Sequence, residues 1–177
     1  AAREISGKNL PLPSFFAGHS LGEYTALAAS GVLDFAATVH LARERGKLMH
    51  EAGLLHPGGM AAIMGLDETS LVHICRQTGT WIANINCPGQ LVISGSRENL
   101  ELAIESAKAK GARRVIPLQV SGAFHTTLMQ SAADHLSMRI NGLHFQEPEV
   151  PIIGNTAARS LTATESIKTE LLNQLCN

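Results

Sequence analysis

The chain has 177 residues, of which 45% are hydrophobic, and its formal net charge at pH 7 is −1. This length and composition fit one compact domain, or one domain with a small inserted lobe, around an aliphatic core. The sequence has no basic run, which argues against nucleic acid as a partner. No apolar run reaches the roughly 18 residues of a membrane span, and the first residues, AAREISGKNL, lack the pattern of a signal peptide.

The three cysteines and eight histidines do not follow a metal-binding or disulfide pattern. Cys75, Cys87 and Cys176 are an odd number at spacings that fit neither a disulfide framework nor a zinc site. No His-Glu-x-x-His motif occurs, and His50 and His56 are not spaced for one helical face. We therefore expect no metal and a location in the reducing cytoplasm.

Strand and helix signals follow one another at the start of the chain. Residues 12–17 predict a short buried strand, with Pro11 and Pro13 at its entrance. A helix over residues 21–30 is expected next, and Gly31 is expected to stop it.

A second helix is expected over residues 35–52, capped by Asp34 and closed by Gly53. The LLHPGG loop at residues 54–59 then marks a boundary between lobes. Beyond it the chain alternates strand, helix, strand, strand, helix and strand, at residues 60–65, 67–77, 81–86, 90–95, 98–110 and 113–120. This order predicts a ferredoxin-like subdomain over residues 58–118.

The last part of the chain predicts a helix, a strand and a helix, at residues 127–141, 150–154 and 164–175. The segments outside the inserted lobe, residues 1–57 and 119–177, therefore form an α/β core with only two or three strands. That number is small for a doubly wound sheet, so we expect the chain to be a fragment of a longer protein.

The sequence Gly18-His19-Ser20-Leu21-Gly22 has the G-x-S-x-G pattern of a nucleophile elbow between a strand and a helix. A sharp turn there projects the Ser20 hydroxyl from the sheet edge. The N-terminus of the following helix aims backbone N–H groups at a developing oxyanion. Because the pattern is short and its residues are common, a turn without chemistry is the alternative.

His125, in VSGAFHTTLM, is the histidine best placed to act as the base of such a serine. It follows a predicted strand, precedes a predicted helix and comes after Ser20 in the chain, as in elbow enzymes. From position alone, a histidine at a helix start without a catalytic partner is an equal alternative. His19 adjoins Ser20, where neighbouring side chains point apart, and we expect it to shape the turn.

Arg45 falls on the inner face of the long helix. At about 100° per residue, its side chain lies within the apolar arc of the helical wheel, between Leu41 and Leu48. Arg43 and Lys47 lie on the solvated arc. A buried guanidinium requires an anion, and its planar fork suits a carboxylate. That carboxylate belongs either to a substrate or to a structural Asp or Glu.

The stretch AGHSLGEYTALAASGVLDFAATVHLARERGKLMHEA closely resembles the malonyl-CoA:acyl-carrier-protein transacylase family of type II fatty acid synthesis. The similarity continues through GGMAAIMGLD, NCPGQLVISGS, GARRVIPLQVSGAFHTTLM and VPIIGNTAA, and so covers nearly the whole chain. The resemblance implies an α/β fold. In this fold the ferredoxin-like subdomain is inserted in an α/β-hydrolase-like acyltransferase core and closes over its cleft.

The resemblance also implies roles for individual residues. Ser20 would carry the malonyl ester, His125 would be its general base and acid, and Arg45 would bind the malonyl carboxylate. The backbone N–H of Leu21 would be one oxyanion donor. Phe124, directly before the histidine, favours malonyl over methylmalonyl. The side chains expected to line the acyl pocket are His19, Met49, Phe124 and Asn155.

The implied reaction moves the malonyl group from malonyl-CoA to the phosphopantetheine thiol of acyl carrier protein, with no resident cofactor. We expect the full-length protein to be a monomer. Family members also have a G-Q-G-S-Q loop, whose first glutamine helps form the oxyanion hole, and a C-terminal segment with further strands and a carbonyl that orients the histidine. This sequence lacks matches to both, so we expect its 177 residues alone to be inactive and poorly stable.

Three other interpretations share some of these features. A serine hydrolase such as a thioesterase would use the same elbow with water as the acceptor. A non-catalytic domain would bind acyl carrier protein and keep the elbow only as a turn. An acyltransferase domain of a larger polyketide or fatty acid synthase would share the chemistry and differ in its flanking sequence.

Overall fold

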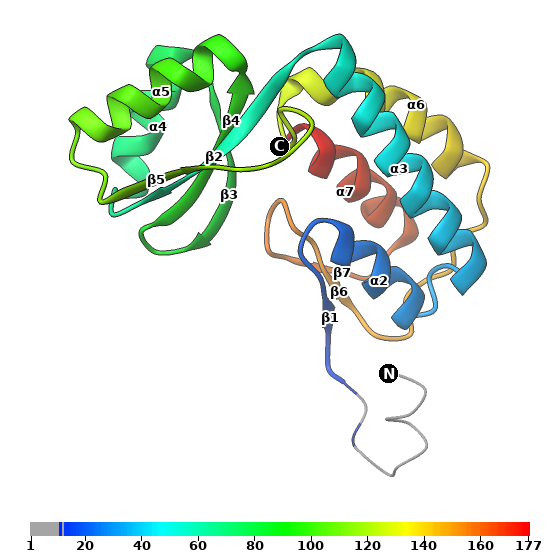
Figure 1. Cartoon of the computed structure of the whole chain (residues 1–177). Coiled ribbons are helices and arrows are strands. Elements are labelled where there is room, and N and C mark those ends of the chain that lie inside the picture. The colour runs from blue at the N-terminus through cyan, green and yellow to red at the C-terminus, as the bar shows by residue number, and fades with distance from the viewer. Residues whose placement is uncertain (1–10, 12) are drawn as a thin grey trace. The chain divides into compact units, whose positions relative to one another are not determined.

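The computed structural model describes residue 11 and residues 13–177, and its fold is mixed α/β (Figure 1). The chain divides into two compact units. The first consists of residues 1–44 and 137–174, and the second of residues 45–136 and 175–177. The segment predicted to be an inserted lobe, residues 58–118, lies wholly within the second unit.

The first unit contains a three-stranded sheet of order β1-β6-β7. Its strands are β1 (Phe16–Ala17), β6 (Ile152–Ile153) and β7 (Ser160–Leu161). β1 and β6 are parallel, whereas β6 and β7 are antiparallel. Because β1 and β6 run in the same direction, the residues that follow these two strands lie at the same edge of the sheet.

The strands of this sheet are shorter than the sequence predicts. Of the predicted strand at residues 12–17, Leu12 lies outside the described residues, and only the last two residues pair with β6. The Phe16 N–H donates to Pro151 O at 2.9 Å, whereas Pro13 has no N–H to contribute to a ladder. The sequence does not predict β7, because a two-residue strand is too short to show a period of two.

Among the described residues, the first unit includes residues of α2 (Leu21–Ala29), α3 (Phe35–Leu55), α6 (Gln130–Asn141) and α7 (Thr164–Cys176). The last three also contain residues of the second unit. α2 buries Tyr24 and Leu27 and is followed by Gly31, whose φ is 78°. Asp34 caps α3 as predicted, since its Oδ1 accepts from the Ala37 N–H at 2.8 Å.

α3 continues to Leu55, so the prediction that Gly53 closes this helix is wrong. A Cβ on Gly53 would lie 2.6 Å from the Ser121 backbone oxygen and 3.3 Å from Gly122 Cα. Glycine is therefore needed inside the helix because a loop approaches it closely, and it does not act as a C-cap.

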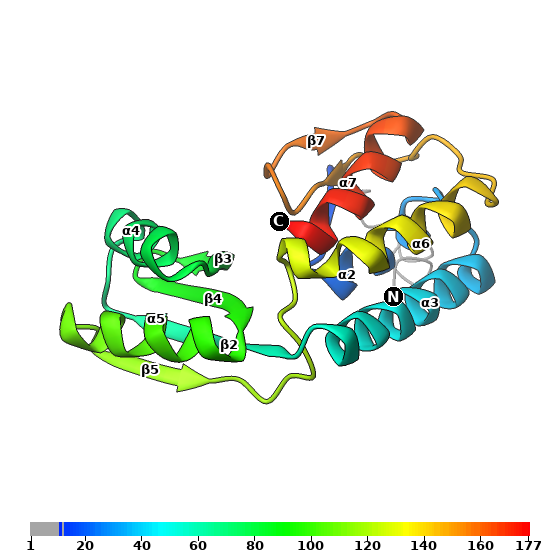
Figure 2. The same cartoon turned by 90° about the horizontal axis from the view of Figure 1, so that it is seen from above.

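The second unit contains a four-stranded antiparallel sheet of order β3-β4-β2-β5 (Figures 1 and 2). Its elements follow the chain as β2 (Gly58–Met64), α4 (Glu68–Thr78), β3 (Trp81–Cys87), β4 (Gln90–Ser96), α5 (Arg97–Ala109) and β5 (Arg114–Pro117). Asp67 is the N-cap of α4, and its Oδ1 accepts from the Ser70 N–H at 2.8 Å, whereas Gly79 is the C-cap. β5 is shorter than predicted because the Val120 N–H turns back to Leu118 O at 3.0 Å.

The central strand β2 is buried on both faces. Ala61 and Ile63 belong to an apolar cluster with side chains of α4 and α5. Met60 and Ala62 belong to a second cluster, against which Phe124 packs. The alternating side chains of one strand thus serve two cores, which explains the continuous apolar run MAAIM.

Candidate active site

The turn between β1 and α2 holds Ser20 in a strained backbone conformation. Ser20 has a φ of 50° and a ψ of −103°, and it is one of three described residues other than glycine with a positive φ. Such a conformation costs on the order of 1–3 kcal/mol and persists only where the surrounding structure holds it. Ser20 occupies the N-cap position, yet its hydroxyl makes no capping hydrogen bond to α2. This geometry is that of a nucleophile elbow.

The two glycines of the motif have different structural roles. A Cβ on Gly18 would lie 2.0 Å from the Gly22 backbone oxygen, far inside van der Waals contact. Apart from its chain neighbours and the backbone of its own helix, a Cβ on Gly22 would meet no described atom within 4 Å. Only Gly18 is therefore required by the close approach of the two backbone segments.

We expect Gly18→Ala to disrupt the elbow and Gly22→Ala to preserve it. In the first variant the backbone must move, and a displacement of about 1 Å at a reacting atom costs on the order of 100-fold in rate. The rate at which a fluorophosphonate, a general probe of activated serines, labels Ser20 in the natural full-length protein measures this effect. Gly22→Ala is the matched control, and equal labelling rates in the two variants would contradict the role given to Gly18.

Asn155 binds the elbow backbone on both sides of His19. It follows β6, and so it lies at the sheet edge where β1 leads into the turn. Its Oδ1 accepts from the Ser20 N–H at 2.7 Å, and its Nδ2 donates to Gly18 O at 2.8 Å. Both polar ends of this side-chain amide are thus directed at the elbow.

The backbone amides from Ser20 to Glu23 differ in their acceptors. The Ser20 N–H donates to Asn155, the Gly22 N–H donates to His19 O at 2.9 Å, and the Glu23 N–H donates to Ser20 O at 3.1 Å. Among the described residues, no acceptor is found for the Leu21 N–H. An amide in this position at a helix N-terminus is suited to stabilising an oxyanion.

A buried polar cluster lies against the elbow. Glu23 of α2 accepts from the Asn155 backbone N–H at 3.2 Å and from Gln174 Nε2 of α7. Gln174 Nε2 also donates to Ser20 O at 3.3 Å. Glu23 and Gln174 are both almost completely buried. The cluster therefore connects the nucleophile turn to the C-terminal helix.

Glu170, one turn before Gln174 on α7, brings a second buried carboxylate close to Glu23. It accepts from the Thr156 N–H at 2.6 Å and from the Thr156 hydroxyl at 2.5 Å. Burial, and after it the charge of Glu170, raise the pKa of Glu23 from 4.5 to about 7. Hydrogen bonds from Asn155 and Gln174 oppose this rise. The two carboxylates thus repel each other when both are ionised.

We expect Glu170→Gln to stabilise the protein most strongly at high pH. Folded wild type retains the Glu23 proton to higher pH than the unfolded chain, so this group lowers stability by up to about 1.4 kcal/mol per pH unit between 4.5 and 7. Glutamine can keep both hydrogen bonds to Thr156 without the repulsion. The thermal midpoint of the full-length variant should therefore exceed that of wild type clearly at about pH 8 and less at about pH 5.

The control for this experiment is Glu165→Gln, since Glu165 is an exposed carboxylate on the same helix. Its replacement should change the midpoint little at either pH, because exposed ion pairs contribute little. An equal shift for Glu170→Gln at both pH values would contradict the coupling between the two buried carboxylates.

His125 lies in the second unit, directly before Thr126, the N-cap of the 3₁₀ helix η1 (Thr127–Met129). It is buried and has a φ of 57°, which is uncommon for a residue with a Cβ. The Thr126 hydroxyl donates to Ala123 O at 2.8 Å and accepts from the Leu128 N–H at 3.2 Å. Hydrogen bonds therefore hold the loop backbone on which this histidine lies.

Arg45 and Met49 lie one turn apart on α3 in the same unit, and both are buried. Arg43 is exposed, so the predicted inward orientation of Arg45 is confirmed. Gly53, one turn beyond Met49 on the same helix, contacts the loop that leads to His125. The second unit thus contains both the predicted base and the predicted anion-binding side chain.

The predicted site residues fall into two groups. The group in the first unit consists of His19, Ser20, Leu21 and Asn155. The group in the second unit consists of Arg45, Met49, Phe124 and His125. Within the first group, hydrogen bonds join Asn155 to Ser20.

Sequence reasoning missed Glu23, Glu170 and Gln174. A signal for the first was present, because Glu23 is the one charged residue in the nine-residue helix LGEYTALAA. The other two are spaced i, i+4 on α7, which places them on one helical face. Nothing in the sequence, however, connects that face with the elbow.

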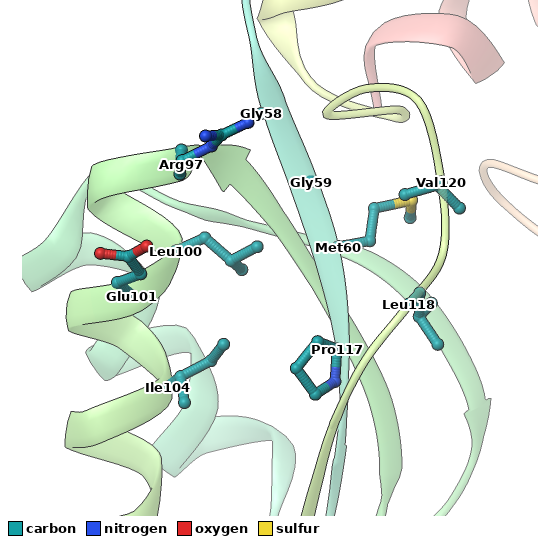
Figure 3. Close-up of a pocket in the computed structure, with 10 residues that line it drawn as sticks. All are labelled: Gly58, Gly59, Met60, Arg97, Leu100, Glu101, Ile104, Pro117, Leu118 and Val120. Atoms are coloured by element: carbon teal, nitrogen blue, oxygen red, sulfur yellow. The ribbon is translucent and has the colours of Figure 1, made fainter.

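A pocket of about 280 Å³ lies elsewhere in the second unit, between α5, β2 and the segment that follows β5 (Figure 3). Leu100 points from α5 toward β2, and Met60 lies near Val120 on the other side of the strand. Arg97 and Glu101 are its charged lining residues. None of the predicted site residues lines this pocket.

Metal-binding groups and two of the thiols were compared with the elbow as possible reactive centres. Among them, no group of three or more His, Cys, Asp or Glu is placed to hold a metal ion. Burial raises the pKa of the Cys75 thiol, and burial together with the Asp134 charge raises that of Cys176, so neither is an activated thiolate. No helix in the described part of the chain is long and apolar enough to cross a membrane.

Comparison with known proteins gives the family of the chain. Residues 6–173 match the acyl transferase domain family. The chain belongs to this family. The malonyl CoA-acyl carrier protein transacylase of Bacillus subtilis (strain 168) is 45% identical to it over 168 residues, which are 92% of this chain and 53% of that protein. This acyl transferase domain thus spans about half the length of the curated relatives that it matches.

Solved structures of related proteins have the same fold. One such structure is a complex of a type II polyketide acyl carrier protein with its malonyl transacylase. A chain of this complex matches with a TM-score of 0.95 and 40% identity, and the match covers 99% of this chain and 58% of that chain. Another is the malonyl CoA-acyl carrier protein transacylase from Coxiella burnetii, with a TM-score of 0.94 and 37% identity, covering 99% of this chain and 57% of that chain. The mixed α/β fold of the domain is therefore that of malonyl transacylases.

Proposed function

We propose that this acyl transferase domain transfers a malonyl group from malonyl-CoA to the phosphopantetheine thiol of acyl carrier protein, through an ester on Ser20. The observation that carries the proposal is the strained elbow, with Ser20 at a φ of 50° and Gly18 against the Gly22 backbone. The names of the relatives support the choice of malonyl and of the carrier protein, since these relatives overlap almost the whole chain.

In the first half-reaction, Ser20 Oγ attacks the thioester carbonyl carbon of malonyl-CoA while His125 accepts the hydroxyl proton. The Leu21 N–H, at the N-terminus of α2, donates to the oxyanion that forms. The tetrahedral intermediate then collapses with cleavage of the C–S bond. His125 returns the proton to the departing sulfur, and coenzyme A leaves a malonyl ester on Ser20.

In the second half-reaction, the thiol of the carrier protein's phosphopantetheine attacks the ester carbonyl. His125 now takes the thiol proton and passes it to Ser20 Oγ as the ester bond breaks. Arg45 binds the free carboxylate of the malonyl group in both halves, with the two-pronged geometry that guanidinium offers. No resident cofactor is needed, because the malonyl-CoA thioester and the thiol of the carrier protein's phosphopantetheine both enter as substrates.

We further infer that residues 58–118 form a ferredoxin-like subdomain inserted in an α/β-hydrolase-like core of residues 1–57 and 119–177. The strand order β3-β4-β2-β5, with α4 and α5 packed on one face, supports this division. Met49, Phe124 and His19 would line the acyl pocket, and Asn155 would border it with its side-chain amide held by the elbow backbone. We also infer that the full-length enzyme is monomeric and cytoplasmic, and the free thiols at Cys75, Cys87 and Cys176 suit a reducing compartment.

Mass spectrometry of the full-length protein after brief mixing with malonyl-CoA tests the proposal. We expect a malonyl adduct on the peptide that contains Ser20, which disappears when acyl carrier protein is added and reappears on its phosphopantetheine. A serine hydrolase would instead release free malonate at the same rate with and without carrier protein. An adduct on another residue, or no adduct, would contradict the assignment of Ser20.

A further inference from the structure

The backbone of Ser20 is held through both of its polar groups. Its N–H donates to Asn155 Oδ1, and its carbonyl accepts from Gln174 Nε2. The partners lie 135 and 154 positions further along the chain, after β6 and on α7. A strained residue needs such contacts, because a φ of 50° would relax if the turn were fixed only by its own sequence.

Asn155 makes the more specific of these contacts. Its side-chain amide accepts from the Ser20 N–H at 2.7 Å and donates to Gly18 O at 2.8 Å, so it closes a ring on the backbone around His19. A side chain that offers both an acceptor and a donor is needed to close this ring. The contact also occupies the Ser20 N–H, which leaves the Leu21 N–H for the oxyanion.

Glu23 fixes Asn155 in turn. The Glu23 carboxylate accepts from the Asn155 backbone N–H at 3.2 Å and from Gln174 Nε2. Glu23 and Gln174 are 1% and 2% exposed, so these hydrogen bonds form where water does not compete. Asn155, Glu23 and Gln174 thus form a connected set of contacts, called the elbow bracket below.

We propose that Asn155 is a positioning residue for Ser20, and that the elbow bracket holds the serine backbone in the strained conformation that its attack requires. Asn155 acts through the backbone of Ser20 and Gly18 and so need not touch the acyl group. The proposal takes from the proposed function only that Ser20 is the nucleophile.

The test compares Asn155→Ala with a matched control in the full-length protein. Asn99 provides the control, because its Nδ2 also donates to a backbone carbonyl, Gly79 O at 3.2 Å, but far from the elbow in the chain and within the second unit. Circular dichroism and the thermal midpoint of each variant report on folding. The rates of Ser20 acylation by malonyl-CoA and of labelling by a fluorophosphonate report on the nucleophile.

We expect Asn155→Ala to lower both rates by on the order of 100-fold, since a small displacement of a reacting atom has that effect. The Kd of malonyl-CoA, taken from the concentration dependence of Ser20 acylation, should change by less than about threefold, because the two lost hydrogen bonds join Asn155 to the backbone and not to substrate. Asn99→Ala should lower the midpoint without changing either rate. Unchanged rates in a folded Asn155→Ala variant would overturn the proposal.

A second variant, Asn155→Asp, provides a readout that a purely structural role would not give. Its carboxylate can accept from the Ser20 N–H but repels Gly18 O, whereas the protonated carboxyl can also donate to Gly18 O. Two titratable groups lie next to this position: Glu23 on α2 accepts from the Asn155 N–H, and Glu170 on α7 accepts from the neighbouring Thr156. His19 is the residue between Gly18 and Ser20, the two partners of the Asn155 side chain. The labelling rate relative to wild type at the same pH should therefore rise as the pH falls from about 8 to about 5.

The outcomes separate this proposal from the proposed function. If wild type forms no malonyl-serine but fluorophosphonate still labels Ser20, the malonyl assignment fails and the labelling ratios still decide the role of Asn155. If malonyl-serine forms equally fast in wild type and Asn155→Ala, the positioning role fails and the function stands. If Asn155→Ala does not fold, the relative rate of Asn155→Asp decides, and a ratio that does not change with pH overturns the proposal.

Discussion

Replacing His125 by asparagine is expected to slow formation of the acyl-serine by about 10²- to 10⁴-fold, the usual contribution of a general base. Asparagine is the sharper substitution here, because His125 has a φ of 57° and asparagine tolerates positive φ better than alanine does. The variant should therefore keep the loop and lose only the proton acceptor. Quenched-flow measurement of malonyl transfer to Ser20 in the full-length protein gives the rate.

His73→Asn is the matched control for this variant, since His73 is exposed on α4. Its acylation rate should equal that of wild type. Fluorophosphonate labelling of His125→Asn should fall together with acylation, because both reactions need a deprotonated Ser20. A wild-type acylation rate in His125→Asn would show that another group accepts the Ser20 proton.

The elbow was predictable from the sequence because its determinants are local. A strand, the motif Gly18-x-Ser20-x-Gly22 and a helix occupy consecutive residues, and their order alone specifies a sharp turn. The two glycines of the motif are not equally required, however. A Cβ on Gly18 would clash with the Gly22 backbone, whereas a Cβ on Gly22 would point into open space. A pattern of residue types cannot distinguish a glycine that is required from one that is tolerated.

The contacts that hold the elbow could not be predicted in the same way. Asn155 and Gln174 lie 135 and 154 positions from Ser20, and only the pairing of β1 with β6 and the packing of α7 bring them near it. The two-residue strands that create this proximity carry no periodic signal. The resemblance to a family identified Asn155 as a candidate, but without indicating that its amide binds the turn.

Gly53 illustrates a different limit. A glycine after a long amphipathic stretch usually ends a helix, and the sequence gives no sign that a distant segment approaches it. In the structure the Ser121 backbone oxygen would lie 2.6 Å from a Cβ at this position, so tertiary packing and not capping explains the residue. The same local rule works at Gly31, where no such approach of backbone occurs and the φ is 78°.

The orientation of Arg45, by contrast, follows from helical periodicity alone. It is 6% exposed, whereas Arg43, two positions earlier, is exposed, as the wheel predicts. Burial of a guanidinium among apolar neighbours is costly unless an anion is bound. The proposed role of Arg45 in selecting an acyl group that carries a carboxylate depends on this cost.

Arg45→Ala is expected to reverse the acyl preference of the domain. Loss of the guanidinium should lower malonyl transfer by on the order of 100-fold or more, because the malonyl carboxylate would then enter an apolar pocket unpaired. Acetyl transfer should be unchanged or faster, since a neutral acyl end gains nothing from a buried cation. The ratio of kcat/KM for malonyl-CoA to that for acetyl-CoA, measured with acyl carrier protein as the acceptor, is the quantity to compare.

Arg43→Ala is the matched control, since it removes the same side chain from the solvated face of the same helix and should leave the ratio unchanged. Arg45→Lys keeps the positive charge but not the planar fork, so its ratio should lie between those of wild type and Arg45→Ala. If Arg45→Ala lowered malonyl and acetyl transfer equally, the arginine would support the fold and not select the substrate. A graded ratio across the three side chains would instead show that the acyl carboxylate is recognised by a two-pronged hydrogen bond.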